Sequence, residues 1–111
     1  MSTFAEVDES QFEQQVLRAS VPVLVEFGAA WCVPCKRLEP ELEKLAFSWK
    51  DRIRLARVDV DQSLNLTMHY QIMSVPTTIL FVDGQPVQRL TGFQPYNKLV
   101  EKLSPHMQAG K

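Results

Sequence analysis

The two cysteines of the chain, Cys32 and Cys35, are separated only by Val33 and Pro34. They directly follow a short apolar run, residues 23–27, which predicts a buried strand, and they stand where a helix is expected to begin. Helical side chains three residues apart have Cβ atoms about 5–6 Å from each other, and a disulfide needs about 3.5–4.5 Å. A small adjustment of the first turn is therefore enough for the pair to cycle between dithiol and disulfide.

The two cysteines are predicted to differ in role because they occupy different depths of this helix. The free backbone N–H groups and the dipole of a helix N-terminus stabilise an anion, so we expect the thiolate of Cys32 to be favoured. Cys35 lies a turn deeper and is more protected. Cys32 is thus predicted to attack a substrate disulfide as the nucleophile, and Cys35 to resolve the mixed disulfide. Pro34 suits a first turn, where no N–H donor is needed.

The residues leave two other interpretations of the cysteines. They can be an incidental buried pair, or they can be part of a zinc site. Zinc needs four ligands, and His69 and His106 are the only histidines, neither at metal-ligand spacing. We expect both histidines to lie on helix surfaces, and we expect no metal and no cofactor.

Glu26 is the one charged residue of the apolar run. Strand alternation places it on the same face as Leu24, while the other face carries the remaining three residues. Both faces are apolar, so one interpretation buries the carboxyl, raises its pKa and allows it to pass protons to a nearby thiol. In the other, Glu26 ends its strand in solvent or pairs with a Lys or Arg. The residues alone leave both open.

Pro76 is a further candidate, in the stretch Val75-Pro76-Thr77 ahead of an apolar strand. A proline in this place is either cis, which tertiary structure must lock, or an ordinary trans proline at the start of a strand.

The rest of the chain predicts alternating helices and strands. A helix follows a capping stretch at Asp8-Glu9-Ser10, and Pro40 should kink the helix that runs over about residues 32–49. The other predicted elements are a possible strand at 4–7, a strand at 53–60, a helix capped by Asp61 and ending near 70, a strand at 77–82, an Asp83-Gly84 hairpin turn, a return strand at 87–90, a helix opened by Pro95 and a frayed tail after Pro105. This order predicts an α/β fold with a mixed sheet and helices on both faces.

Composition limits the function classes. The 111 residues suit a single domain over 1–111, and 45% hydrophobic with 23% charged residues is typical of a soluble globular protein. A net charge of -1 argues against nucleic-acid binding. We see no targeting segment and no apolar run that is long enough to span a membrane. We therefore expect a cytoplasmic protein, in a compartment where structural disulfides are rare.

Taken together, these motifs resemble those of the thioredoxin family. The matching residues run from about Phe4 to Leu103: Val25-Glu26-Phe27, Trp31-Cys32-Val33-Pro34-Cys35-Lys36, Pro40, Val75-Pro76-Thr77, Phe81-Val82-Asp83-Gly84 and Gly92. The family's usual active site reads Trp-Cys-Gly-Pro-Cys-Lys, so the site in this chain is atypical.

The resemblance implies a thioredoxin fold, with a central mixed five-stranded sheet flanked by four helices, and an exposed Cys32. It implies that cis-Pro76 faces the disulfide across a shallow substrate groove, and that an extended substrate segment pairs with the backbone near Val75. The groove residues are Trp31, Val33, Pro34, Val75, Pro76 and Gly92.

The resemblance also implies an activity and partners. A monomeric protein-disulfide reductase would exchange electrons with disulfide-containing protein substrates, and a thioredoxin reductase, either NADPH-flavin or ferredoxin-linked, would recharge it. A thioredoxin-like peptide-binding or holdase module, and an oxidase or isomerase with a shifted redox potential, are the alternatives. No His separates the cysteines to over-stabilise the thiolate, which favours a reductant.

Several positions depart from the family pattern. Val33 replaces a Gly, Glu26 replaces an Asp, and Gly28 replaces a large Trp. Arg57 stands where the family usually has a Lys near the buried acid, so it either tunes the charge of Glu26 or is a solvated strand residue. Lys36, next to Cys35, is a second candidate modulating residue.

Overall fold

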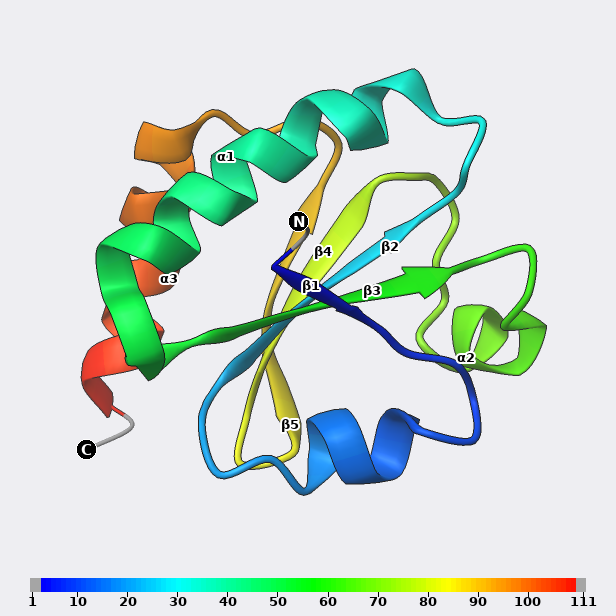
Figure 1. Ribbon diagram of the computed structural model, residues 1–111, viewed down its shortest axis with the longest axis horizontal. Coiled ribbons are helices and arrows are strands. Elements are labelled where there is room, and N and C mark those ends of the chain that lie inside the picture. Colours follow the sequence, from blue (N-terminus) through cyan, green and yellow to red (C-terminus); the bar gives the residue numbers. More distant parts are fainter. Residues whose placement is uncertain (1–2, 110–111) are drawn as a thin grey trace.

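The predicted alternation of helices and strands is present in the structure, a computed structural model that describes residues 3–109 (Figure 1). Its elements are β1 (Phe4–Glu6), η1 (Glu13–Leu17), β2 (Val23–Gly28), α1 (Val33–Trp49), η2 (Lys50–Arg52), β3 (Arg54–Asp59), α2 (Leu64–His69), β4 (Thr77–Val82), β5 (Gln85–Thr91) and α3 (Tyr96–Ala109). Here η1 is a single π-helical turn and η2 a 3₁₀ turn. No helix within residues 3–109 has the length and apolar character needed to cross a membrane.

The strands form one mixed sheet in the order β1-β3-β2-β4-β5. The first three of these are parallel, whereas β4 runs antiparallel to both β2 and β5. The expected mixed five-stranded sheet is therefore confirmed. The three parallel strands bring their carboxyl ends to one edge, and the chain leaves β2 at that edge to enter α1 (Figure 1). Such an edge is where α/β proteins commonly place their sites.

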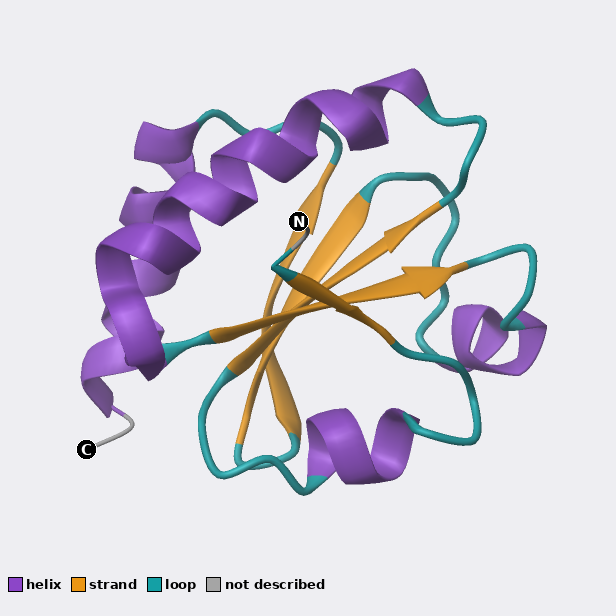
Figure 2. Cartoon of the chain, in the orientation of Figure 1, coloured by secondary structure: helices purple, strands orange, loops and turns teal. Residues whose placement is uncertain are grey.

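Helices cover both faces of the sheet, as Figure 2 shows: α1 and α3 lie on one face, and η1 and α2 on the other. Each face has its own apolar core, as expected for strands with two buried faces. Leu24 belongs to the core beneath α1 and α3, while its neighbours Val23 and Val25 belong to the core beneath η1 and α2. The alternation along β2 thus directs the side chain of Glu26, two residues after Leu24, toward α1.

The hairpin between β4 and β5 turns at Asp83 and Gly84, as predicted. Their φ angles are 53° and 79°, and two consecutive positive values match the two-residue turn that suits the twist of a hairpin. Gly84 also passes close to η1, because a Cβ at this position would lie 2.8 Å from the carbonyl oxygen of Leu17. A side chain is therefore excluded here by both conformation and space.

Helix α1 is Val33–Trp49, so its predicted bounds are confirmed to within one residue. Pro40 lies inside it, and the helix curves as it crosses the sheet in Figure 1. The first predicted helix is reduced to η1, whose residue before the turn, Phe12, has no side-chain cap. Asp8 instead accepts a hydrogen bond from the backbone N–H of Gln11 at 3.1 Å, and so it orders the turn that leads into η1.

The prediction that Asp61 caps the third helix is wrong. The residue that precedes α2 is Ser63, and it makes no side-chain cap. The carboxylate of Asp61 accepts a hydrogen bond from Trp31 Nε1 at 2.8 Å, while its backbone N–H bonds to the side chain of Asp59. Asp61 thus contacts Trp31 of the cysteine loop and does not cap α2. Local sequence does not reveal this contact.

The prediction of a frayed tail after Pro105 is also wrong, because α3 continues through Pro105 to Ala109. Two contacts beyond the proline hold this last turn. Met107 is buried in the core beneath α1 and α3, and His106 Nε2 lies 3.0 Å from Gln88 Oε1 of β5. Tertiary packing therefore outweighs the local effect of the proline.

Candidate active site

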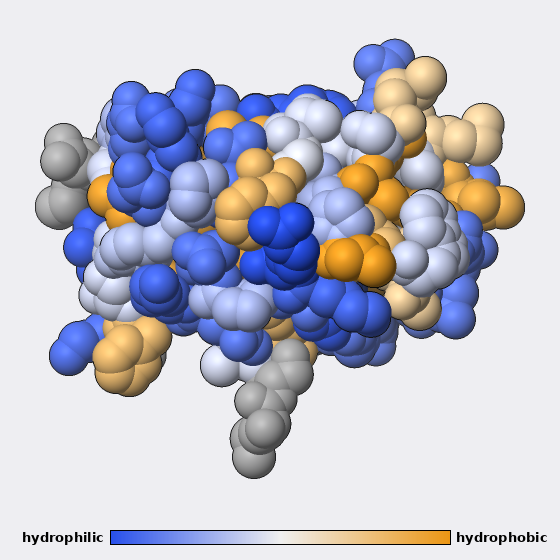
Figure 3. Space-filling view, turned by 90° about the horizontal axis from the view of Figure 1, so that it is seen from above, coloured by the Kyte–Doolittle hydropathy of each residue, from blue (hydrophilic) through white to orange (hydrophobic). Residues whose placement is uncertain are grey.

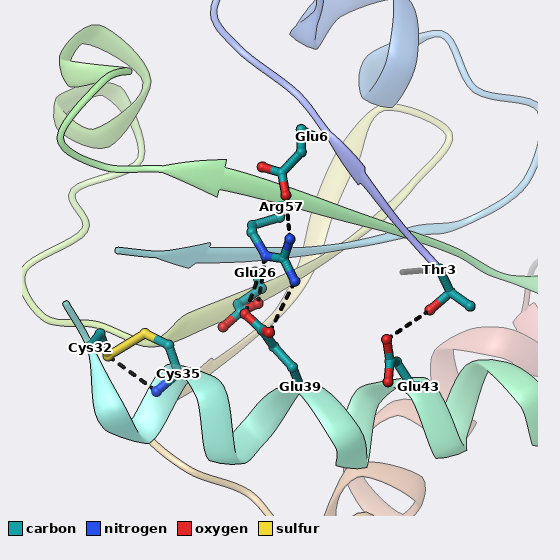
Figure 4. A network of polar contacts seen from close by, with 8 residues as sticks. All are labelled: Thr3, Glu6, Glu26, Cys32, Cys35, Glu39, Glu43 and Arg57. Carbon is teal, nitrogen blue, oxygen red and sulfur yellow. Dashed lines mark hydrogen bonds and ion pairs between the residues drawn. A yellow bond between two sulfur atoms is a disulfide. The ribbon is translucent and has the colours of Figure 1, made fainter. Parts of the chain in front are cut away.

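The cysteines lie at the start of α1, at the carboxyl edge of the parallel strands (Figure 4). Cys32 is the N-cap residue, and Cys35 lies inside the first turn. They form a disulfide with their Cα atoms 5.3 Å apart, and the backbone N–H of Cys35 donates to Cys32 Sγ at 3.1 Å. A free N–H group of the helix start is therefore directed at the sulfur of Cys32, as the prediction of a favoured thiolate requires.

The expected exposure of Cys32 is wrong for the disulfide form. Cys32 is 3% exposed and Cys35 1%, so accessibility does not distinguish them. The bond to Cys35 and the hydrogen bond from its N–H turn the sulfur of Cys32 toward the helix, away from solvent. What distinguishes the two residues is their position in the helix: one caps it and the other lies within it.

Glu26 is completely buried, which decides between its two interpretations. Neither carboxyl oxygen has a hydrogen-bond partner among residues 3–109. The nearest cation is Arg57, whose Nε lies 3.8 Å from Glu26 Oε1. The carboxyl is thus held beneath α1, close to one positive charge but without the hydrogen bonds that a buried carboxylate normally needs.

Arg57 holds together a row of charged side chains that crosses the parallel strands (Figure 4). The strand register pairs it with Glu6 of β1 on one side and with Glu26 of β2 on the other. Its guanidinium makes an ion pair with Glu6 and reaches up to Glu39 of α1, with Nη2 3.0 Å from Oε1 and Nε 3.2 Å from Oε2. Arg57 is therefore a contact of the buried acid and not a solvated strand residue.

The surroundings of Glu26 raise its pKa from 4.5 to about 8. Burial is the largest cause, because it penalises the charged form. The carboxylate of Glu39 raises the pKa further, through repulsion and because it can accept a hydrogen bond from Glu26 once that group is protonated, and Glu6 adds a smaller repulsion. Arg57 acts in the opposite direction but does not compensate. A carboxyl of this kind can hold or release a proton near neutral pH.

Gly28, at the end of β2, lies between Glu26 and Cys35. A Cβ built on Gly28 would be 3.1 Å from Cys35 Sγ and 3.3 Å from Glu26 Oε2. The buried carboxyl and the inner sulfur therefore face the same small space, which glycine leaves free. Gly28 also lines a cavity of about 280 Å³ on the surface, together with Glu6, Ala29, Ala30, Lys36, Glu39, Arg57 and Asp59.

The predicted groove residues surround the cysteines with mixed exposure. Trp31 and Val33 are largely exposed, at 66% and 64%, and Figure 3 shows apolar side chains gathered toward the end of the molecule where α1 begins. The Val75–Pro76 peptide bond is cis, as the resemblance implied. Pro76 is buried, and its carbonyl oxygen accepts a hydrogen bond of 2.8 Å from the backbone N–H of Gly92.

The remaining predicted site residues differ in exposure. Pro34 and Lys36 are exposed on the first turn of α1, and Val75 is half-buried. His69 ends α2 and is exposed, while His106 lies in α3. Within the described part of the chain, no three His, Cys, Asp or Glu side chains come together in a way that suits a metal ion.

Two functional candidates, Glu6 and Glu39, were missed by sequence reasoning. The signal for Glu39 was present, because it follows Cys35 by four residues and so lies on the same face of the helix. Glu6 carried no comparable signal, since its place beside Arg57 depends on the register of β1 against β3.

Comparison with known proteins gives a consistent result. The family model described as thioredoxin matches residues 3–105. Thioredoxin 1 of Synechococcus elongatus is 36% identical over 107 residues, which cover 96% of this chain and 100% of that protein. The thioredoxin of Alicyclobacillus acidocaldarius is 42% identical over 95 residues, covering 86% of this chain and 90% of its own. That of Staphylococcus aureus is 41% identical over 101 residues, covering 91% and 95%.

Proposed function

The chain belongs to the thioredoxin family and is a thiol–disulfide oxidoreductase, a protein-disulfide reductase, and from this premise we propose how its residues divide the reaction. In our proposal Cys32 is the nucleophile, Cys35 the resolving thiol and Glu26 the group that exchanges a proton with Cys35. The observation that carries this assignment is the place of the two sulfurs: one caps α1, and the other faces Gly28 beside Glu26.

The first step is the attack of Cys32 on a substrate disulfide. The thiolate of Cys32 forms a bond to one substrate sulfur, and the other substrate sulfur leaves with the electron pair of the broken bond. The N–H group that points at Cys32 Sγ stabilises the thiolate before the attack. The product is a mixed disulfide between Cys32 and the substrate.

The second step is the attack of Cys35 on the sulfur of Cys32. Cys35 must first lose its thiol proton, and the ionised form of Glu26 takes it. The new bond restores the Cys32–Cys35 disulfide, and the remaining substrate sulfur leaves with the electron pair. The protein has then given two electrons to the substrate.

The substrate is proposed to lie across the exposed Trp31 and Val33, with an extended segment pairing with the backbone beside Val75. Pro34, Pro76 and Gly92 would complete the groove, and Lys36 would act on charge near its rim.

A thioredoxin reductase, NADPH-flavin or ferredoxin-linked, is the proposed electron source, and disulfide-containing proteins are the proposed substrates. A cytoplasmic location is part of this proposal, because that compartment keeps thiols reduced. The protein is proposed to act as a monomer.

The division between the cysteines is tested by trapping the mixed disulfide. The Cys35→Ser variant should accumulate a covalent complex with insulin or another disulfide substrate, because its second step is blocked. Mass spectrometry detects this complex. The Cys32→Ser variant should form at least tenfold less complex and should not reduce insulin. Equal trapping by the two variants would contradict the assignment, and so would a Cys32→Ser variant that reduces insulin at the parent rate.

A further inference from the structure

Glu39 has a position that the two-cysteine reaction does not by itself require. It lies on α1 between the buried carboxyl of Glu26 and the surface cavity, in contact with the guanidinium of Arg57 (Figure 4). Its side chain is 26% exposed, whereas that of Glu26 is 0% exposed. Glu39 therefore has one side toward the buried acid and one side toward solvent.

One atom of Arg57 brings the two carboxyls together. The Nε atom lies 3.2 Å from Glu39 Oε2 and 3.8 Å from Glu26 Oε1, so both oxygens surround the same nitrogen. The outer nitrogens of the guanidinium contact Glu39 and Glu6. The guanidinium of Arg57 thus contacts both Glu39 and Glu26, and it also pairs with Glu6.

Two ionised carboxylates cannot hydrogen-bond to each other, because neither has a proton to donate. A single proton changes this, since a protonated carboxyl donates to its neighbour, and carboxyls held this close take up one proton as a pair. Neither Glu26 oxygen has a hydrogen-bond partner among the described residues, and one proton shared with Glu39 would give one of them a partner.

The cavity of about 280 Å³ supplies the connection to solvent. Glu39 and Arg57 line it, as do Gly28, Lys36, Asp59 and Glu6, whereas Glu26 and Cys35 do not. On the buried side, Glu26 Oε2 and Cys35 Sγ face the same space at Gly28. Glu39 thus borders the cavity, whereas Glu26 and Cys35 meet on its buried side at Gly28.

We propose that Glu26 and Glu39 act as a carboxyl pair sharing one proton, in which Glu39 is the positioning residue that sets when Glu26 is ionised and passes its proton to the cavity. This inference rests on the function proposed above, in which Glu26 serves Cys35. The proton that leaves the Cys35 thiol goes to Glu26, then to Glu39, and then to solvent. In the reverse direction, a proton from the pair reaches Cys35 when it leaves as a thiolate from the Cys32–Cys35 disulfide.

The groups that face Glu26 define which variants to make. They are Arg57 of β3, Glu6 of β1, and Glu39 and Cys35 of α1, with Lys36 and Asp59 at the cavity. Replacing Glu39 with Gln removes the negative charge that opposes ionisation of Glu26 but keeps the size of the side chain. Glu39→Asp keeps the charge, and it should restore the parent behaviour at least in part.

The experiment follows the two cysteines separately. The reduced protein is mixed rapidly with dithiobis(nitrobenzoate), whose first coloured thiolate is released by Cys32 and whose second is released when Cys35 resolves the mixed disulfide. Both rates are measured from pH 5 to 10. For Glu39→Gln we expect the midpoint of the second release to move down by about one pH unit, equivalent to tenfold in the ionisation equilibrium. The first release should keep its midpoint.

Glu43→Gln is the matched control. Glu43 lies one turn further along α1, where its carboxylate accepts a hydrogen bond from Thr3 Oγ1 at 3.4 Å, away from Arg57 (Figure 4). This variant should give the parent profile for both releases. Thermal unfolding of each variant at pH 7 separates an effect on the pair from a loss of folded protein.

The outcomes separate this inference from the function on which it rests. Suppose that Glu26→Gln abolishes the pH dependence of the second release but that Glu39→Gln leaves its pH midpoint unchanged. Glu26 then acts alone, and the proposed carboxyl pair is refuted. If Glu26→Gln leaves that midpoint unchanged, the proposed role of Glu26 itself fails. If Glu39→Gln and Glu43→Gln shift the midpoint equally, the effect is one of net charge and the pair is again refuted.

Discussion

Two neighbouring regions under α1 differ sharply, although one strand supplies both. Leu24 and Glu26 are separated by one residue of β2 and point to the same face of the sheet. Leu24 lies in an apolar core with Leu42 and Leu45, and all three are fully buried. Glu26 is equally buried, but its surroundings are Arg57 and Glu39.

Stability and chemistry are thus separated within one small domain. The apolar region beneath the later turns of α1 and α3 removes side chains from water and supplies favourable free energy. The charged region beneath the first turn buries a carboxyl without hydrogen bonds, which opposes folding whenever that carboxyl is ionised. The second region keeps a proton-exchanging group next to Cys35, and the first region holds the helix in place above it.

Leu42→Ala should have the largest effect on stability. Leu42 is fully buried between α1 and the sheet, and removing such a side chain usually lowers the free energy of unfolding by about 2–5 kcal/mol. Urea unfolding measures the change, and the folded fraction should reduce insulin at the parent rate. Leu64→Ala, at a position that is 62% exposed on α2, should change stability by less than about 0.5 kcal/mol. Equal losses of unfolding free energy in the two variants would show that the apolar core beneath α1 is not what stabilises the fold.

Glu26→Gln should stabilise the protein, and the gain should depend on pH. With a pKa of about 8 when folded and 4.5 when unfolded, Glu26 is protonated in both states at low pH. As pH rises through this window, the unfolded chain releases the proton first, so stability falls and the full penalty applies above about pH 8. Gln has no such penalty.

The expected gain is therefore small near pH 4, about 2 kcal/mol or more at pH 7, and largest above pH 8, since one pKa unit corresponds to about 1.4 kcal/mol. Urea unfolding of parent and variant at several pH values measures it. A difference that stays constant across this range would show that Glu26 titrates normally, and the proposed contrast between the two regions would then lose its basis.

Gly28→Ala should have a smaller effect on stability but a clear effect on Cys35. The added methyl would lie 3.1 Å from Cys35 Sγ and 3.3 Å from Glu26 Oε2, closer than side chains normally pack, so one of the two must move. We expect a loss of about 1 kcal/mol, typical of modest overpacking, and a resolution step slowed by roughly threefold to tenfold. Rapid-mixing kinetics should show the first release unchanged. A parent-like second release would mean that this space is not used.

Asp61→Ala should have the smallest effect. The hydrogen bond from Trp31 Nε1 is exposed, so its removal should lower the free energy of unfolding by about 0.5–1 kcal/mol. Neither the Glu26 midpoint nor the resolution rate should change, because Asp61 lies outside the charged row. A shift in the midpoint of Glu26 would show that Asp61 influences its ionisation, so the charged region would include the cysteine loop.

The sequence predicted the parts of the site that depend on local order. The spacing of Cys32 and Cys35, the preceding strand and the helix start all follow from residues close together in the chain, and alternation placed Glu26 on the face of Leu24. The mixed sheet and the Asp83 turn were predicted in the same way.

The missed features depend on tertiary contacts. Glu6 joins Arg57 and Glu26 only because β1 pairs with β3 in one parallel register, which no local pattern specifies. Asp61 was assigned to a cap because residue type favours one, but Trp31 competes for its carboxylate. The end of α3 was misjudged because burial of Met107 outweighs the helix-breaking tendency of Pro105.

We expect the carboxyl beneath the active cysteines to be mostly protonated near neutral pH. The most direct test is a ¹³C NMR titration of the side-chain carboxyl of Glu26, assigned by comparison with Glu26→Gln, from pH 4 to 10. We expect a midpoint of about 8 for Glu26. A midpoint near the ordinary glutamate value of about 4.3 would contradict it.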